Sequence, residues 1–208
     1  MASKMKKGFT VLLLLTVFFA LSLGVLGYFF GVFSPVRITT GMRGPYLMTY
    51  MPHRGAYHRV LGKIEKVGRM LDKKHIAKTI PCAFFYDDPK DVPLEKLKSE
   101  GGYLVDEDLQ LEHPFGQRKI PARGVIIATV KAHPMVAPFK TYRKIVEFMQ
   151  MHRLDHNGPA MERYLPGGIV EVEMPFISPG LDQLRQTVNS VKFQDHSKKI
   201  PAHQKEKR

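Results

Sequence analysis

The chain begins with a long apolar stretch close to its amino terminus. Residues 8–36 are twenty-nine positions without a charged side chain, and Lys4, Lys6 and Lys7 precede them. As an α-helix rising about 1.5 Å per residue, the core of this stretch, 9–33, would be about 37 Å long, and the hydrocarbon layer of a bilayer is about 30 Å thick. We therefore predict a basic amino terminus over 1–7 and one transmembrane anchor over 8–36.

A secretory signal peptide is the alternative interpretation of a basic start followed by apolar residues. Signal peptides have a shorter apolar region, of about 7–15 residues, which ends in a small-x-small cleavage site. Here the stretch closes on Tyr28, Phe29 and Phe30 without a convincing cleavage site. The pattern favours an uncleaved anchor, whose partner would be membrane lipid.

Beyond the anchor, the polarity pattern occurs twice. Residues 37–45 are rich in Pro, Gly and Thr, which predicts a linker. Each copy then shows a strand, a helix with apolar residues at three- and four-residue spacing, and two more strands. In the first copy these elements are expected at 46–51, 57–71, 80–86 and 102–105. In the second copy they are expected at 124–130, 139–149, 159–165 and 169–176.

This repetition predicts an α+β domain over 46–178. Two pseudo-repeated βαββ units would form one antiparallel-rich sheet with both helices on one face. The second helix would present one apolar face, made by Phe139, Tyr142, Ile145, Val146 and Met149. After the domain we expect a short packing helix over 179–194 and a disordered basic tail over 195–208, which has little to bury.

The charge of the chain indicates which partners it attracts. It has 32 Lys and Arg against 19 Asp and Glu, a formal charge of +13. Beside an anchor, the anionic surface of a bilayer is the expected partner. No zinc-finger, RNP-like or helix-turn-helix pattern occurs, which argues against nucleic acid. Cys82 is the single cysteine, and the spacing of His152 and His156 lacks the carboxylate motif of a metal site, so we expect no disulfide, metal or cofactor.

Four motifs in the domain resemble those of GyrI-like domains, the effector-binding or SOUL-like family. They are His53-x-Gly55-x-Tyr57 before the first helix, Phe84-Phe85-Tyr86-Asp87-Asp88-Pro89 with the following Val92-Pro93 and the Lys-rich 94–99, Glu162-x-Tyr164, and the closing strand 171–177. The resemblance covers roughly residues 46–177. It implies the fold of two βαββ repeats that the polarity pattern also predicts.

The same resemblance implies several kinds of function. GyrI-like domains occur in transcription regulators, in a gyrase-binding protein, in hydrolases of reactive small molecules and in membrane-anchored proteins, which include an ER-anchored autophagy receptor. The anchored members resemble this chain most, because their anchor also precedes the domain directly. The receptor's long acidic tail has no counterpart here, so the scaffold is carried over and the autophagy role is not.

The side of the membrane on which the domain lies stays open. Three lysines precede the anchor, and only Arg37 and Arg43 follow it closely. This distribution leans towards a cytoplasmic amino terminus with the domain on the far side. The resemblance to the ER-anchored group points the other way.

Glu162 is the main candidate for a binding residue. In ligand-binding members of the family, an acidic residue lies in an aromatic-lined pocket and meets lipophilic cations. A desolvated carboxylate is costly alone, and a cation would relieve that cost, with about 0.5–2 kcal/mol added by aromatic faces. The aromatic residues expected around it are Tyr46, Tyr57, Phe85, Tyr142 and Tyr164. The alternative is an exposed Glu162, or one paired with a basic neighbour such as Arg163.

Three functions remain open at this stage. We favour a binding domain for a small lipophilic, cationic ligand or a protein. The alternatives are a hydrolase that uses Glu162 to activate water, and a membrane scaffold whose cleft is vestigial. The family's hydrolases are expected to pair their glutamate with a Trp, which this chain lacks, and no Ser or Cys occurs in a nucleophile motif, so catalysis is disfavoured.

Overall fold

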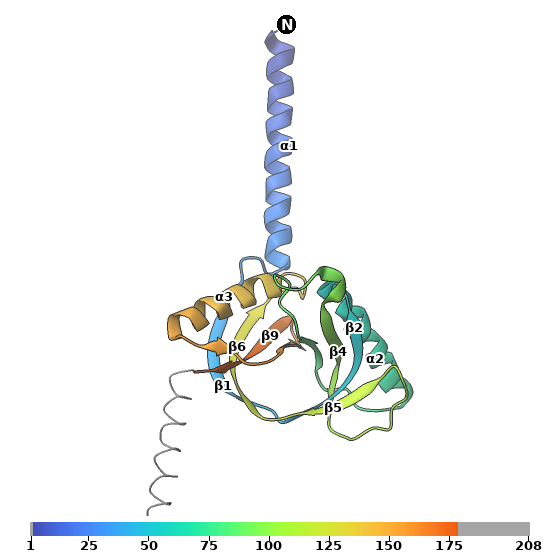
Figure 1. Cartoon of the computed structure of the whole chain (residues 1–208). Helices are drawn as coiled ribbons and strands as arrows, with labels where there is room; N and C mark the ends of the chain where they lie inside the picture. Colours follow the sequence, from blue (N-terminus) through green and yellow to red (C-terminus); the bar gives the residue numbers. More distant parts are fainter. Residues whose placement is uncertain (1, 179–208) are drawn as a thin grey trace, which may run out of the picture.

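Helix α1 (Ala2–Phe29) projects away from the rest of the protein (Figure 1). The structure is a computed structural model and describes residues 2–178. The segment Leu12–Phe29 is long and apolar enough to cross a membrane, and none of it is buried. The helix ends at Phe29 and not near Val36 as expected. Gly31 has φ +74°, and a Cβ there would lie 2.5 Å from the Lys131 carbonyl oxygen, so the chain turns sharply against the domain at this point.

The domain consists of two halves with the same order of elements, as the sequence predicts. The first half comprises β2 (Tyr46–Arg54), α2 (Leu61–Lys73), β3 (Pro81–Phe85) and β4 (Lys98–Val105). The second half comprises β6 (Arg123–Lys131), α3 (Ala137–His152), β8 (Ala160–Leu165) and β9 (Ile169–Ile177). The strand order is β1-β6-β9-β8-β3-β4-β2-β5 with antiparallel pairs, and the halves meet where β3 pairs with β8. The α+β fold with two βαββ units in one antiparallel sheet is confirmed.

Three shorter elements connect these strands. They are the two 3-10 helices η1 (Tyr57–Val60) and η2 (Leu94–Lys96), and β7 (Asp155–His156), which pairs with β9 off the main path. The Asp87-Asp88-Pro89 segment follows β3 as a turn, in which the Asp88 carboxylate accepts a hydrogen bond from the Lys90 N–H at 2.9 Å. This is ordinary turn chemistry for an Asp before Pro.

The expected linker over 37–45 is wrong, because most of it forms strand β1 (Arg37–Arg43). This strand pairs with β6 of the second half over seven residues. A further strand that the polarity pattern did not predict, β5 (Gly116–Ile120), pairs with β2 of the first half. Each half is thus preceded in sequence by a strand that extends the other half. Both strands are short and largely polar because they lie at the edges of the sheet.

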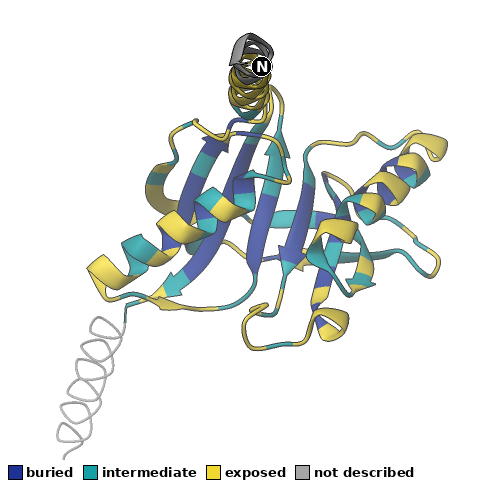
Figure 2. Cartoon of the chain, turned by 90° about the horizontal axis from the view of Figure 1, so that it is seen from above, coloured by how far each residue is buried: buried dark blue, intermediate teal, exposed yellow. Residues whose placement is uncertain are grey.

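The sheet has two faces of different composition. Helices α2 and α3 lie on one face, with strands visible between them (Figure 2). Alternate residues of β6 and β9, such as Ile126, Val130 and Val172, pack under α3, and Val67 and Leu71 of α2 pack against Val105. We call the opposite face the arginine face, because its side chains include Arg43, Arg118, Arg123 and Arg163.

The apolar face expected for the second helix is only partly correct. Ile145 is fully buried, and Tyr142 and Met149 are half-buried against the core. Phe139 is 82% exposed and Val146 is 47% exposed. These two residues lie three before and four after Tyr142, so all three share one side of α3, at the border of its buried face. The expected helix over 179–194 and the tail over 195–208 lie outside the described residues.

We expect β1 to be required for a stable domain. A chain that starts at Pro45 loses the whole β1–β6 pairing and the packing of Ile38 against the core under α3, whereas a chain that starts at Val36 keeps both. Denaturant titration should show a loss of about 2 kcal/mol or more for the shorter chain, and the exposed edge of β6 should promote aggregation. Equal stability of the two chains would contradict a structural role for β1.

Candidate functional site

Glu162 lies near the middle of the sheet, on strand β8. Its backbone is registered with Ala83 of β3 and Val172 of β9, so the two halves of the domain hold it from both sides. Its side chain points to the helix-bearing face, because its neighbours Met161 and Arg163 face the other way. The residue is only 2% exposed.

Tyrosine hydroxyls surround the Glu162 carboxylate. The Tyr164 hydroxyl, two residues along the same strand, donates a hydrogen bond to Oε2 at 2.8 Å. The Tyr142 hydroxyl, which α3 brings from above the sheet, lies near this carboxylate and lowers its pKa. In the described residues, no Lys, Arg or His nitrogen lies within 4.0 Å of it. Glu162 is therefore a buried acid whose partners are neutral.

Tyr57 and Phe85 extend this aromatic group towards the first half. Their rings are 4.7 Å apart in a T-shaped arrangement, and Phe85 and Tyr164 pack against the same small core under α2. The Tyr57 hydroxyl donates to the Asp87 carbonyl oxygen at 2.7 Å and accepts from the Asp87 N–H at 3.0 Å. Tyr57 is thus fixed by the turn after β3. Its hydroxyl is engaged there and does not reach Glu162, so Tyr57 contributes only its ring to the aromatic group.

The buried position changes the acidity of these groups. Burial raises the pKa of Glu162 to about 7, although the hydroxyls of Tyr164 and Tyr142 oppose the rise. Burial also raises the pKa of Tyr142 and of Tyr164 well above the ordinary value, and the nearby carboxylate of Glu162 adds to both shifts. At neutral pH the tyrosines are therefore neutral donors, while Glu162 is divided between its acid and its carboxylate.

The alternative placement of Glu162, exposed or paired with Arg163, is wrong. Arg163 lies on the arginine face, where its Nη1 is 2.8 Å from Glu171 and 3.1 Å from Glu173. These two carboxylates alternate with Val170 and Val172 along β9, which is why they face away from α3. The alternation is visible in the sequence, but the pairing with Arg163 depends on the register between β8 and β9.

Tyr46 is a correction to the expected site. It lies on the arginine face, where its hydroxyl donates to Glu173 Oε1 at 2.9 Å and its ring is 5.4 Å from the guanidinium carbon of Arg163. The sheet therefore separates it from Glu162. Of the six residues expected to form the site, the structure brings together five, namely Glu162, Tyr164, Tyr142, Tyr57 and Phe85.

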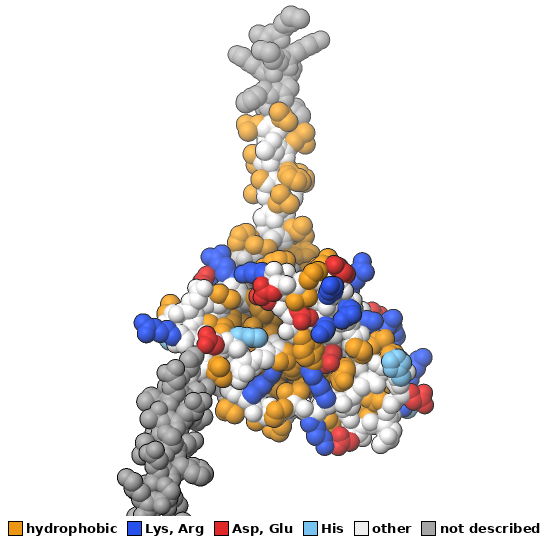
Figure 3. Space-filling view, viewed as in Figure 1, with side chains coloured by type: hydrophobic (Ala, Val, Ile, Leu, Met, Phe, Trp, Pro, Cys, Tyr) orange, Lys and Arg blue, Asp and Glu red, His pale blue; other side chains and the backbone are white. Residues whose placement is uncertain are grey.

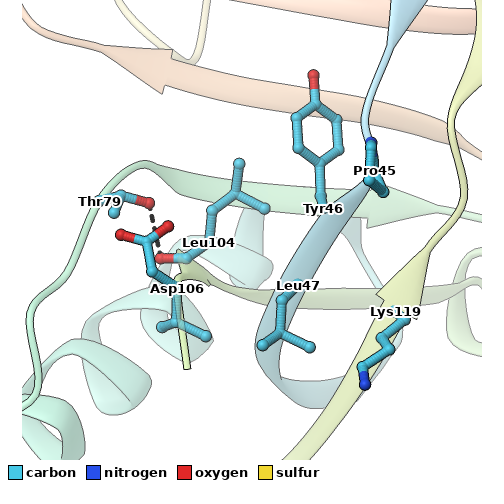
Figure 4. Close-up of a pocket in the computed structure, with 8 residues that line it drawn as sticks. Pro45, Tyr46, Leu47, Thr79, Leu104, Asp106 and Lys119 are labelled. Atoms are coloured by element: carbon cyan, nitrogen blue, oxygen red, sulfur yellow. Dashed lines mark hydrogen bonds between the residues drawn. The ribbon is translucent and has the colours of Figure 1, made fainter. Parts of the chain in front are cut away.

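The cavity drawn in Figure 4 belongs to another part of the molecule. It measures about 410 Å³ and is open to solvent, and Tyr46 is the one expected site residue in its lining. Thr79 closes one side through a 2.8 Å hydrogen bond to the Leu104 carbonyl oxygen, and Asp106 and Lys119 lie at its border (Figure 4). Because this lining brings together little convergent chemistry, we regard the buried Glu162 group as the better functional candidate. Its carboxylate is closed over by tyrosines, so a ligand would have to displace a ring.

Residues 42–174 match the family model described as the GyrI-like small molecule binding domain. The match spans more than half of the chain, and the chain therefore belongs to this family and carries a small-molecule binding domain. It aligns with the crystal structure of the EcmrR C-terminal domain at a TM-score of 0.59 and 13% identity, over 69% of this chain and 98% of that one.

A second neighbour is the EcmrR chain of an EcmrR–DNA complex solved by cryo-electron microscopy. The TM-score is 0.58 at 14% identity, over 68% of this chain and 57% of that one. At these identities the likeness shows the fold alone, and DNA binding by EcmrR is not carried over. The comparison with curated proteins finds no match.

We expect the stability of the domain to report on Glu162. Its folded pKa of about 7 lies above the ordinary 4.5, so the folded state binds the extra proton and loses stability as the pH rises between these values. The difference between the two pKa values corresponds to a change in the free energy of unfolding of at most about 3 kcal/mol. Denaturant titrations of the wild type and Glu162→Gln, at about pH 5 and about pH 8, should show wild-type stability falling relative to the variant by up to that amount.

Glu147→Gln is the matched control on the surface of α3. Lys144 and Arg143 hold the pKa of the Glu147 carboxyl below its ordinary value, so its contribution is lost as the pH falls, in the opposite direction. If the difference between wild type and Glu162→Gln does not change with pH, Glu162 is not the buried, raised acid described above.

Proposed function

We propose that this protein is a membrane-anchored GyrI-like domain that binds a small lipophilic cation, with Glu162 as the counter-charge. One observation carries the proposal: Glu162 is 2% exposed, the Tyr164 hydroxyl hydrogen-bonds to its carboxylate, and no Lys, Arg or His nitrogen lies within 4.0 Å of it in the described residues. An ionised carboxylate in such surroundings is destabilised, and a bound cation would relieve that cost.

The aromatic residues around the carboxylate support the same ligand class. Tyr57, Phe85, Tyr142 and Tyr164 are half-buried residues around the buried acid. Aromatic faces attract cations and provide apolar contact for a lipophilic body. A ligand that rotates Tyr142 aside would replace the tyrosine hydroxyl with a charge interaction.

A hydrolase is the second candidate, because a pKa of about 7 also suits a general base that activates water. Two further functions remain open. The site could bind a protein, or the protein could be a membrane scaffold whose site is vestigial. Binding of a cation is favoured because the site brings a carboxylate together with aromatic rings and neutral donors, and no Lys, Arg or His nitrogen lies within 4.0 Å of the carboxylate among the described residues.

We expect tetraphenylphosphonium to bind to the domain and its isosteric anion tetraphenylborate not to bind. Glu162→Gln keeps the size of the side chain and removes the charge, so it should weaken the cation by about 1.5–3 kcal/mol. Affinity for the cation should rise with pH through about 7, as Glu162 ionises. Isothermal titration calorimetry on a chain that starts at Val36 measures the affinity for each ion, the effect of Glu162→Gln and the pH dependence.

Glu147→Gln is the control here as well, because it removes an exposed carboxylate from α3 without touching the site. It should bind the cation like the wild type. No binding of the cation to the wild type, or equal binding to Glu162→Gln, would contradict the cation proposal and leave the scaffold as the better function.

The base of α1 is fastened to the domain, which supports a fixed orientation at the membrane. Lys140 in the first turn of α3 donates to the carbonyl oxygens of Gly31, Val32 and Ser34. The His133 N–H donates to the Phe30 carbonyl oxygen at 3.1 Å, and the two rings are 5.0 Å apart. The start of α3 therefore lies at the foot of α1 (Figure 1).

Apolar and basic side chains occur together on this side of the molecule. Phe139 is 82% exposed and Met135 is 47% exposed, both beside the contacts of Lys140. Figure 3 shows the apolar surface of α1 and, at its foot, Lys and Arg side chains beside apolar ones. Apolar side chains that enter the interface and cations that meet anionic headgroups are the usual means by which a surface lies on a bilayer.

We expect Phe139 to contact the bilayer when α1 spans it. The chain contains no Trp, so Phe139→Trp creates a single reporter, and Met151→Trp places the same reporter on a similarly exposed site at the other end of α3. In vesicles with brominated lipid, the indole fluorescence of the Phe139→Trp variant should be quenched and blue-shifted, and that of the Met151→Trp variant should be neither. The full chain should also stay with the vesicles in a carbonate wash. Equal quenching in the two variants would contradict this orientation, and release by carbonate would contradict the anchor.

A further inference from the structure

Arg123 is a half-buried arginine that lacks a carboxylate partner in the described chain. It is the first residue of β6, and its side chain lies on the arginine face, 5.3 Å from the Phe84 ring to the guanidinium carbon. Its Nη1 donates to the Pro159 carbonyl oxygen at 3.3 Å. Its Nε and Nη2 are buried without a hydrogen-bond partner, and among residues 2–178 no Asp or Glu oxygen lies within 4.0 Å of it.

Arg118 of β5 lies over the same ring. Its guanidinium carbon is 4.4 Å from the centre of Phe84 and 5.6 Å from those of Tyr50 and Tyr86. Its Nη2 is 3.0 Å from Glu100 Oε2, but the two atoms are not aligned as a hydrogen bond, and its Nε and Nη2 are also buried without a partner in the described chain. The side chain is 29% exposed, so solvent reaches this end of the pair.

The remaining carboxylates of this face pair with other arginines through their Oε1 atoms, and Glu173 Oε2 is buried without a hydrogen-bond partner in the described chain. Glu171 and Glu173 pair with Arg163 at 2.8 and 3.1 Å, and Arg43 approaches them at 3.6 and 3.7 Å. Four guanidinium groups thus face three carboxylates on the arginine face, and the unmatched charge falls on Arg123. A cation with buried, unfilled donors is costly, because neither water nor a counter-ion replaces the solvation it lost.

We propose that the arginine face holds a second binding site, for an anionic group held between Arg118 and Arg123 above the ring of Phe84. The unfilled N–H groups of two guanidinium forks match the oxygens of a carboxylate or a phosphate. Tyr50 is half-buried and Tyr86 is exposed, and both add an aromatic surface, so the best ligand joins the anion to a flat apolar body. Burial lowers the pKa of Arg123, which agrees with a charge that lacks its counter-ion.

This site is independent of the proposed cation site. The two lie on opposite faces of one sheet, because Met161 and Arg163 face the arginine face and Glu162 between them faces the helices. The two sites also have opposite charge, since one holds a carboxylate and the other holds guanidinium groups. A ligand of the arginine face should therefore bind equally well when Glu162 is replaced.

The test uses the full chain in a non-ionic detergent, with benzoate and inorganic phosphate as probes and chloride at the same ionic strength as reference. Thermal unfolding should show that benzoate raises Tm in a saturable way and more than chloride. Arg123→Met should raise Tm without any anion, because it removes the unpaired charge, and it should abolish the effect of benzoate. Arg123→Lys keeps the charge but not the fork and should weaken benzoate about tenfold or more.

Two controls make the result specific. Arg37→Met removes an exposed arginine at the far end of β1 and should leave the effect of benzoate unchanged. Glu162→Gln should leave it unchanged as well, so failure of the cation proposal does not affect this one. A larger effect of phosphate than of benzoate would identify a phosphate group as the ligand. An effect no larger than that of chloride, or one that survives in both Arg123 variants, would overturn the proposal.

Discussion

The rest of the structure depends on one constraint: each half is completed by the strand, β1 or β5, that precedes the other half in sequence. β1 precedes the first half and completes the second, and β5 precedes the second half and completes the first. The two connections that follow these strands meet: a Cβ on Gly44, which has φ +90°, would lie 3.2 Å from the Pro121 carbonyl oxygen. Neither half can therefore form its full set of strands without the other, and the join at β3 and β8, where Glu162 lies, is held from both edges.

This arrangement gives one sheet two chemically opposite faces. Under the helices, Glu162 is a buried acid without a basic partner among residues 2–178, and the Tyr164 hydroxyl hydrogen-bonds to it. On the other face, Arg123 is a base whose buried donors are unfilled in the described chain. Both depart from the general rule that buried charges are paired. Natural sequences tolerate such costs mainly where function requires them, so the two departures are the natural places to search for ligands.

The sequence predicted the parts of the fold that local periodicity determines. β2, α2, β6, α3 and β9 have a clear period of two or of three to four residues, and each was located within a few positions. β1 and β5 were missed because a polar edge strand has no periodicity of its own and exists only through its partner. Their partners, β6 and β2, lie far away in sequence.

The candidate site divides in the same way. Glu162, Tyr164, Tyr57 and Phe85 stand in the motifs of the resemblance, and Tyr142 followed from its place in the proposed fold. Tyr46 was assigned to the wrong face, because the direction of its side chain depends on the register across β2, β4, β3 and β8, which one sequence does not reveal. The unmatched charge of Arg123 was invisible for a similar reason, since only the assembled face shows which arginines already have carboxylates.

The foot of α1, the proposed membrane anchor, is connected to the Glu162 group through a single helix. Lys140 fastens α3 to the backbone that leaves α1, and Tyr142 follows two residues later with its hydroxyl near the Glu162 carboxylate. Phe139, Tyr142 and Val146 share one side of this helix, so its accessible apolar residues border the ring that closes the site. Rotation or displacement of α3 would move the anchor contact, the exposed Phe139 and the ring of Tyr142 together, because a helix of this length moves as a stiff unit. In the proposed membrane-anchored protein, access to Glu162 is therefore physically tied to the position of α1.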